Sequence, residues 1–136
     1  ATGSIAIGML IAENLKKPFI YVRPEPKGHG AGKQIEGIVL EKVPVVVIED
    51  LISTGKSSLN AVEALQKNGI EVLGVFAIFS YDLEVAKSNF EKANQKFYSL
   101  SDFSTLIKCS KKHMDFSQED LDKVNSWKKS PTNWMV

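Results

Sequence analysis

The sequence predicts an α/β fold in which a parallel sheet is flanked by helices, because strand-like and helix-like segments alternate along most of the chain. Short runs rich in β-branched and aromatic residues stand at Pro18–Arg23, Val45–Ile48, Val72–Phe79 and Lys96–Leu100. Segments with the helical period of apolar residues stand before, between and after them. With 136 residues, we expect a single domain over residues 1–136.

The composition is typical of a cytosolic globular protein, with 43% hydrophobic and 24% charged residues. The 17 basic residues nearly balance the 16 acidic ones, which argues against a nucleic-acid partner held by a broad cationic face. The apolar runs fall short of the roughly 18 residues that a membrane span needs, so we expect no membrane partner and a cytoplasmic location. Cys109 is the only cysteine, which excludes an internal disulfide and a cysteine-only metal site.

The first forty residues predict a helix, a strand and a loop. Ser4–Leu15 is dense in Ile, Ala, Met and Leu, and it predicts a buried helix. Pro18–Arg23 predicts a short strand. Pro24–Gly37 holds two prolines and four glycines, which predicts a flexible loop over about residues 24–37. Ile38–Leu40 could form a short strand leaving this loop.

The middle of the chain predicts a buried strand and an amphipathic helix. Val45–Ile48 is a continuous β-branched run, as expected for a parallel strand covered on both faces. Ser57–Lys67 then changes to the helical period. Its apolar stripe is formed by Leu59, Val62 and Leu65, with Ala61 and Ala64 beside it. Asn68 and Gly69 supply the helix C-cap.

The last third predicts two strands and three helices. Val72–Phe79 is an apolar strand, and Asp82 is the expected cap of the helix after it. Ser101 is expected to cap a further helix. Residues 117–120, Ser-Gln-Glu-Asp, resemble a capping box before another. We therefore expect a C-terminal helical segment over about residues 101–129.

Residues 45–58, VVVIEDLISTGKSS, form the strongest functional motif. An apolar strand ends in Glu49 and Asp50, and the turn Ser53-Thr54-Gly55 then opens a helix. Backbone N–H groups and the positive dipole at a helix start bind anions, and small residues let a phosphate approach the backbone. Carboxylates would repel the same phosphate, but they accept hydrogen bonds from the hydroxyls of a sugar and they bind cations. The segment therefore predicts a site for a phosphorylated sugar.

Two other phosphate-binding motifs are excluded. Gly55-Lys56-Ser57 matches the end of a P-loop, but Asp50 stands where that motif needs glycine. Gly28 and Gly30 match part of a dinucleotide fingerprint, but Lys33 takes the place of the third glycine. The plain alternative for the two acids is a solvated strand end before a helix N-cap. The turn and helix that follow make it the weaker interpretation.

The glycine-rich loop of residues 23–33 is the second motif. Arg23, Lys27 and His29 are spaced along it. Cations on a flexible loop suit a diphosphate leaving group, because loop closure excludes water and strengthens each contact. The alternative is a solvated loop with scattered charges, which the loop alone does not exclude.

Residues 45–58 resemble the phosphoribosyl-diphosphate signature of the type I phosphoribosyltransferases, and the 23–33 loop resembles the mobile catalytic loop of the orotate enzymes among them. The resemblance implies transfer of phosphoribosyl from phosphoribosyl diphosphate to orotate, in pyrimidine biosynthesis. The products are orotidine monophosphate and diphosphate. It also implies Mg²⁺ bound through the diphosphate substrate, no metal site of the chain's own, and a homodimer with shared active sites.

The resemblance also assigns roles to residues. The catalytic residues it implies are Lys27, His29 and Asp50. The implied phosphoribosyl-diphosphate ligands are Arg23, Lys27, His29, Glu49, Asp50, Leu51, Ile52, Ser53, Thr54, Gly55, Lys56 and Ser57. The implied orotate-binding residues are Ser53 and Tyr81. The turn at Ala1–Ile5 resembles the diphosphate-binding loop of the family, with Gly3 where many members have lysine.

Three departures from the family keep alternatives open. Tyr81 stands nearest the position where many orotate enzymes have an arginine, and Pro24 follows Arg23 where a second basic residue is common. The N-terminal part of the family is absent, and the chain begins at Ala1 without a methionine, so we expect a truncated protein. The alternatives are a purine or uracil phosphoribosyltransferase, a non-catalytic phosphoribosyl-diphosphate-binding regulator, and an inactive fragment.

Overall fold

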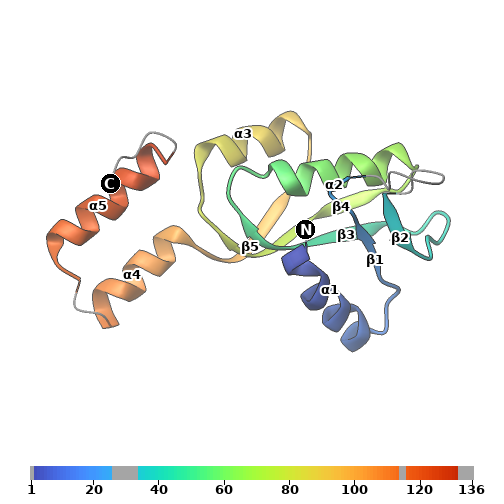
Figure 1. Ribbon diagram of the computed structural model, residues 1–136, viewed down its shortest axis with the longest axis horizontal. Coiled ribbons are helices and arrows are strands. Elements are labelled where there is room, and N and C mark those ends of the chain that lie inside the picture. Colours follow the sequence, from blue (N-terminus) through green and yellow to red (C-terminus); the bar gives the residue numbers. More distant parts are fainter. Residues whose placement is uncertain (1, 26–33, 114–115, 132–136) are drawn as a thin grey trace.

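The computed structural model describes residues 2–25, 34–113 and 116–131, and it shows an α/β chain in which the first three helices lie around a central sheet and the last two extend beyond its end (Figure 1). Its elements are α1 (Thr2–Leu15), β1 (Ile20–Val22), β2 (Ile35–Gly37), β3 (Val45–Ile52), α2 (Lys56–Lys67), β4 (Val72–Ser80), α3 (Glu84–Lys92), β5 (Phe97–Asp102), α4 (Phe103–His113) and α5 (Gln118–Lys129). None of these helices has the length and apolar character that crossing a membrane requires.

The central sheet is parallel and has the order β3-β4-β5, which confirms the predicted fold class. At its carboxyl edge Ile52 pairs with Ser80, and Ser80 pairs with Asp102. The segments that follow β3, β4 and β5 therefore begin side by side. Ligands of open α/β sheets bind at this edge. A second, two-stranded sheet is formed by β1 and β2, which pair antiparallel.

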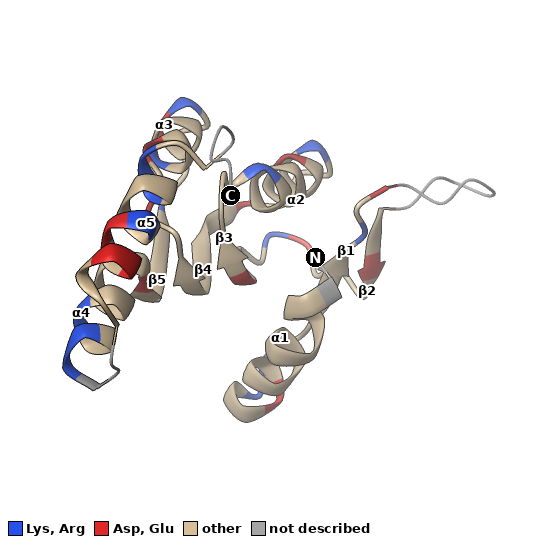
Figure 2. Ribbon diagram, turned by 60° about the vertical axis from the view of Figure 1, so that its left-hand side comes forward, with Lys and Arg blue, Asp and Glu red and all other residues tan. Residues whose placement is uncertain are grey.

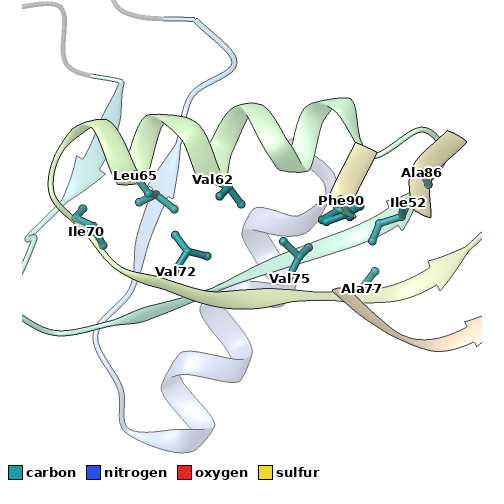
Figure 3. Packing of buried hydrophobic residues seen from close by; sticks show 9 residues of the cluster. All are labelled: Ile52, Val62, Leu65, Ile70, Val72, Val75, Ala77, Ala86 and Phe90. Atoms are coloured by element: carbon teal, nitrogen blue, oxygen red, sulfur yellow. The ribbon is translucent and has the colours of Figure 1, made fainter. Parts of the chain in front are cut away.

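Helices α2 and α3 bury their apolar faces against one side of the sheet (Figure 3). The buried cluster consists of Ile52, Val62, Leu65, Ile70, Val72, Val75, Ala77, Ala86 and Phe90. The predicted stripe of α2 is confirmed, because Val62 and Leu65 are buried and Leu59 packs against the cluster. The predicted C-cap is confirmed too, with Asn68 at the cap position and Gly69 at φ +74°.

Helix α1 packs against β3 on the side away from α2 (Figure 3). Gly8 allows this close approach, because a Cβ there would lie 3.0 Å from the Phe19 ring and 3.8 Å from Ile48 Cβ. The prediction that this helix is buried is wrong for its outer face, where Leu10 remains 67% exposed. Figure 2 shows that α1 is nearly free of charge, whereas Lys, Arg, Asp and Glu gather on the other helices.

Strand β3 is not covered on both faces as predicted, because Val46 remains 47% exposed. The reason lies in its position in the sheet. β3 is an edge strand among the described residues. Helix α1 alone lies against its face away from α2, and α1 does not cover that face completely.

The other corrections concern local boundaries. A strand over Ile38–Leu40 was predicted and is wrong, since β2 lies three residues earlier, where Ile35 and Gly37 pair with β1. Asp82 does not cap α3: Leu83 holds the N-cap position, and the N–H of Asp82 donates to Ser80 Oγ at 3.0 Å.

The two C-terminal helices are capped by side chains that accept backbone N–H groups. Asp102 Oδ1, rather than Ser101, accepts the N–H of Thr105 at the start of α4. The predicted capping box is confirmed at α5, where the Ser117 side chain and backbone exchange hydrogen bonds with Asp120. Helix α5 then packs back on the sheet end through Trp127, whose ring lies 5.1 Å from that of Tyr81.

Candidate active site

The turn between β3 and α2 fixes the start of α2 at the carboxyl edge of the sheet. Gly55 has φ +78°, a left-handed conformation that favours glycine. A Cβ at Gly55 would also lie 2.6 Å from Cε2 of Phe90. No other residue therefore fits this position without displacing the core.

The first turn of α2 starts without a side-chain cap for its backbone N–H groups. The helix begins with Gly55 at the N-cap position and has no side-chain cap hydrogen bond, and the N–H of Lys56 makes only a long contact, 3.5 Å, with Thr54 Oγ1. The first N–H groups of a helix have no partner inside the helix, and they attract anions. Around them lie the exposed side chains of Ser53, Thr54, Lys56 and Ser57. This arrangement suits a phosphate group.

Helix α3 supports the turn from behind. The side-chain amide of Asn89 donates to the carbonyl oxygen of Thr54 at 3.0 Å. The next residue, Phe90, is 2% exposed and lies against Gly55. The turn is thus fixed by one hydrogen bond and one aromatic contact.

Glu49 is buried beneath the turn, with 4% of its surface exposed. Its Oε2 accepts the hydroxyl of Ser58 at 2.9 Å and that of Ser57 at 3.5 Å. Its Oε1 accepts the hydroxyl of Ser4 at 3.4 Å and the N–H of Asp50 at 3.3 Å. Burial raises the pKa of Glu49 above its ordinary value of 4.5; the Ser58 hydrogen bond opposes that rise and the neighbouring Asp50 adds to it.

Asp50 has the opposite environment, since its side chain is exposed at the surface. Its Oδ1 accepts the N–H of Leu51 at 2.9 Å. Helix α1 starts beside it, because a Cβ at Gly3 would collide with the Asp50 carboxylate. The predicted turn at Ala1–Ile5 is therefore already helical from Thr2 onward, while Ala1 lies outside the described residues.

The structure brings the acids and the turn together, but Arg23 lies elsewhere. Arg23 follows β1, and its Nη1 lies 3.4 Å from Glu36 Oε1 on the paired strand. The backbone N–H of Arg23 donates to the carbonyl oxygen of Gln34 at 2.8 Å. The side-chain Nε of Arg23 is buried without a hydrogen-bond partner among the described residues. Lys27 and His29 lie outside the described residues.

The remaining predicted ligands differ in what they can offer. Leu51 is exposed, whereas Ile52 is 1% exposed and belongs to the core, so only its backbone could meet a ligand. The Ile52 carbonyl accepts the N–H of Tyr81 at 3.0 Å. The Tyr81 ring packs in an aromatic cluster with Phe79, Phe103 and Trp127, at centroid distances of 5.6, 6.5 and 5.1 Å. Its predicted contact with orotate stays a prediction.

A hollow of about 310 Å³ lies between α1, β1 and β3. It reaches Ser4 and Glu49 at one end, but apolar side chains such as Ile5, Phe19 and Val46 line most of it. Such a lining offers few groups to a phosphate. We therefore place the anion site at the start of α2 and not in this hollow.

Sequence reasoning missed four supporting residues: Ser4, Ser58, Asn89 and the contact role of Phe90. The burial of Ser58 could have been predicted from the sequence, because Ser58 stands four and seven residues before Val62 and Leu65 on the buried stripe of α2. A hydroxyl on a buried stripe needs a polar partner. No sequence pattern could have predicted the contact of Ser4 with Glu49, since the two residues are 45 positions apart.

The chain is similar to curated orotate phosphoribosyltransferases, although no protein-family model matches it. It is 44% identical to the enzyme of Cytophaga hutchinsonii over 134 residues, which are 98% of the chain and 64% of that protein. It is 48% identical to the enzyme of Bacillus subtilis over 131 residues, which are 96% of the chain and 61% of that protein. The chain thus spans less than two thirds of these relatives.

A solved structure agrees with these relatives. The orotate phosphoribosyltransferase of Aeropyrum pernix superimposes with a TM-score of 0.69 and 32% sequence identity. The match covers 80% of this chain and 60% of that one.

Gly55 is constrained both by its positive φ and by its contact with Phe90, and a comparison with Gly69, which has only the positive φ, separates the two effects. Gly69→Ala introduces a side chain at φ +74° with nothing within 4 Å, so we expect a loss of about 1–2 kcal/mol from left-handed strain alone. Gly55→Ala adds a collision with Phe90, and we expect it to cost about 1–3 kcal/mol more. Urea unfolding of both variants measures the difference. Equal losses would show that Phe90 does not restrict the turn.

The buried Glu49 predicts a pH dependence of stability. Because its pKa is raised in the folded state, Glu49 contributes most to folding below its ordinary pKa of 4.5, and this contribution is lost as the pH rises through the raised value. We expect the unfolding free energy of the parent to fall, relative to Glu49→Gln, between pH 4.5 and neutral pH. Urea unfolding across this range measures it, with Glu91→Gln, an exposed glutamate of α3, as the control. A constant difference between parent and Glu49→Gln would contradict the prediction.

Proposed function

We propose that the protein is a type I phosphoribosyltransferase that transfers phosphoribosyl from phosphoribosyl diphosphate to orotate, because the chain is similar to orotate phosphoribosyltransferases over nearly its whole length. The products are orotidine monophosphate and diphosphate. One observation carries the proposal: the Gly55 turn joins an exposed carboxylate on β3, Asp50, directly to an uncapped helix start.

The 5′-phosphate of the substrate binds at the start of α2. Its oxygens accept the free N–H groups of the first helical turn, which need no charged side chain. The hydroxyls of Ser53, Thr54 and Ser57 and the ammonium group of Lys56 are exposed around the same turn. The rigid turn keeps these donors in place before the substrate arrives, which lowers the cost of ordering them.

The ribose lies beside Asp50. Displacement at its anomeric carbon builds positive charge on the sugar, and a carboxylate that accepts hydrogen bonds from the ribose hydroxyls stabilises that charge. Asp50 is the exposed member of the acidic pair. The predicted contact of Glu49 with the ribose stays a prediction, since that carboxylate is 4% exposed. The reaction needs no covalent nucleophile.

The diphosphate leaves with the electron pair of the broken bond, so cations around it favour the reaction. Arg23 at the end of β1 is one, and Lys27 and His29 follow it in sequence. Mg²⁺ enters bound to the diphosphate as part of the substrate. Among the described residues, no three His, Cys, Asp or Glu side chains are placed to hold a metal ion.

A homodimer with shared active sites completes the proposal. The segment that carries Lys27 and His29 joins β1 to β2, away from the β3–α2 turn in sequence. In a shared site these two side chains act on substrate held by Asp50 of the other subunit. The resemblance to orotate enzymes supports this arrangement.

Asp50→Asn tests the binding site. Losing a charged hydrogen bond to the sugar costs about 1.5–3 kcal/mol, so we expect phosphoribosyl diphosphate to bind roughly tenfold to a hundredfold more weakly. Isothermal titration calorimetry with Mg²⁺ present measures the affinity. Asp122→Asn, which changes an exposed aspartate of α5, is the matched control. Unchanged affinity in Asp50→Asn would remove this residue from the site.

A product assay tests the base. We expect turnover with orotate and none with uracil or hypoxanthine, because the loop of residues 23–33 resembles that of the orotate enzymes. Each base is mixed with phosphoribosyl diphosphate and Mg²⁺, and the nucleotide formed is measured by chromatography. Turnover of hypoxanthine alone would assign the protein to the purine enzymes.

A further inference from the structure

Glu49 is an unusual residue for the floor of a ligand site, because its carboxylate faces the protein interior. It is 4% exposed, and it accepts hydrogen bonds through both oxygens. A carboxylate taken out of water is costly unless its hydrogen bonds are replaced. The side chains that replace them belong to two different helices.

Ser58 provides the shortest of these hydrogen bonds, at 2.9 Å. It lies in the first turn of α2 and is 1% exposed, so its hydroxyl is out of reach of any ligand. The bond ties the start of α2 to β3. Any effect of Ser58 on ligand binding must therefore pass through the position of the helix.

Ser4 provides the link to the second helix. It lies in the first turn of α1, is 5% exposed, and donates to Glu49 Oε1 at 3.4 Å. The adjacent Gly3 lies against Asp50. Both helix starts therefore meet at the acidic pair of β3, and one carboxylate contacts both of them.

We propose that Glu49 is a positioning residue, which holds the starts of α1 and α2 in register across β3 through the hydroxyls of Ser4 and Ser58. The contribution to ligand affinity rests on the proposed function, whereas the contribution to helix position does not. In this assignment Asp50 contacts the sugar, and Glu49 keeps the phosphate-binding turn and the start of α1 at the separation that one ligand spans.

Hydrogen exchange without ligand tests the positioning role. The amides of residues 6–8 and 59–61 are among the first to donate hydrogen bonds inside α1 and α2. We expect Glu49→Ala to speed their exchange about three- to tenfold in both helices, and Ser58→Ala to do so in α2. Glu49→Gln keeps the shape, and its amide can accept from Ser4 through the oxygen and donate to the Ser58 hydroxyl through the nitrogen, so its exchange is expected to stay near the parent.

Ser110→Ala is the matched control, because it also removes a buried serine hydroxyl from a helix, at 8% exposure in α4. We expect no change at residues 6–8 or 59–61 in this variant. Unchanged exchange in both Glu49→Ala and Ser58→Ala would overturn the proposal. Where Glu49→Ala does not fold, Ser58→Ala alone decides, by whether residues 59–61 are deprotected.

Calorimetry with phosphoribosyl diphosphate separates the proposal from the proposed function. We expect Ser58→Ala to bind about three- to tenfold more weakly and Ser110→Ala to bind like the parent. Unchanged binding by Ser58→Ala would overturn the contribution of this positioning to ligand affinity. A parent that binds no ligand would refute the proposed function, and the exchange measurement would still decide the role of Glu49.

Discussion

The contact between Phe90 and Gly55 is the constraint on which the site depends. Phe90 comes from α3, is 2% exposed, and packs against Phe97 of β5 with the rings tilted at 37° and a centroid distance of 4.5 Å. The same ring touches the turn that joins β3 to α2. One side chain thus connects α3, the far strand of the sheet and the start of α2. The turn at which we propose phosphate binding is therefore supported by the core itself, although it lies on the surface.

The two neighbouring acids acquire different properties because a strand points successive side chains to opposite faces. Glu49 faces the helix starts and is buried, and its pKa is raised by that burial. Asp50 faces solvent beside Gly3. Sequence alone gives the pair one role, but the pleat of β3 gives the two carboxylates two environments. A solvated carboxylate suits a ligand, whereas a buried one suits the positioning of other groups.

The parts of the fold that the sequence predicts are those set by local periodicity. The stripe of Val62 and Leu65 and the capping box at Ser117 depend on residues a few positions apart, so their pattern is visible in the sequence. Strand β2 depends on a partner, β1, and its position was predicted three residues too late. In the candidate site, the turn and the acids form one contiguous motif, so the sequence alone shows that they lie close together. The contact of Ser4 with Glu49 joins residues that only the folded sheet brings together.

The distribution of charge is compatible with the proposed binding of a strongly anionic substrate by a chain with a net charge of +1. The start of α2 offers backbone N–H groups, which attract a phosphate without adding net charge. Arg23 is already paired with Glu36 across the hairpin, and the two side chains are 39% and 25% exposed. A partly solvated ion pair of this kind contributes little to stability. A diphosphate that binds the Arg23 guanidinium therefore replaces Glu36 at little cost. In the proposed reaction, the cation on the hairpin and the carboxylate on β3 belong to separate elements. The two charges therefore do not neutralise each other, and each remains available to the part of the substrate that it stabilises.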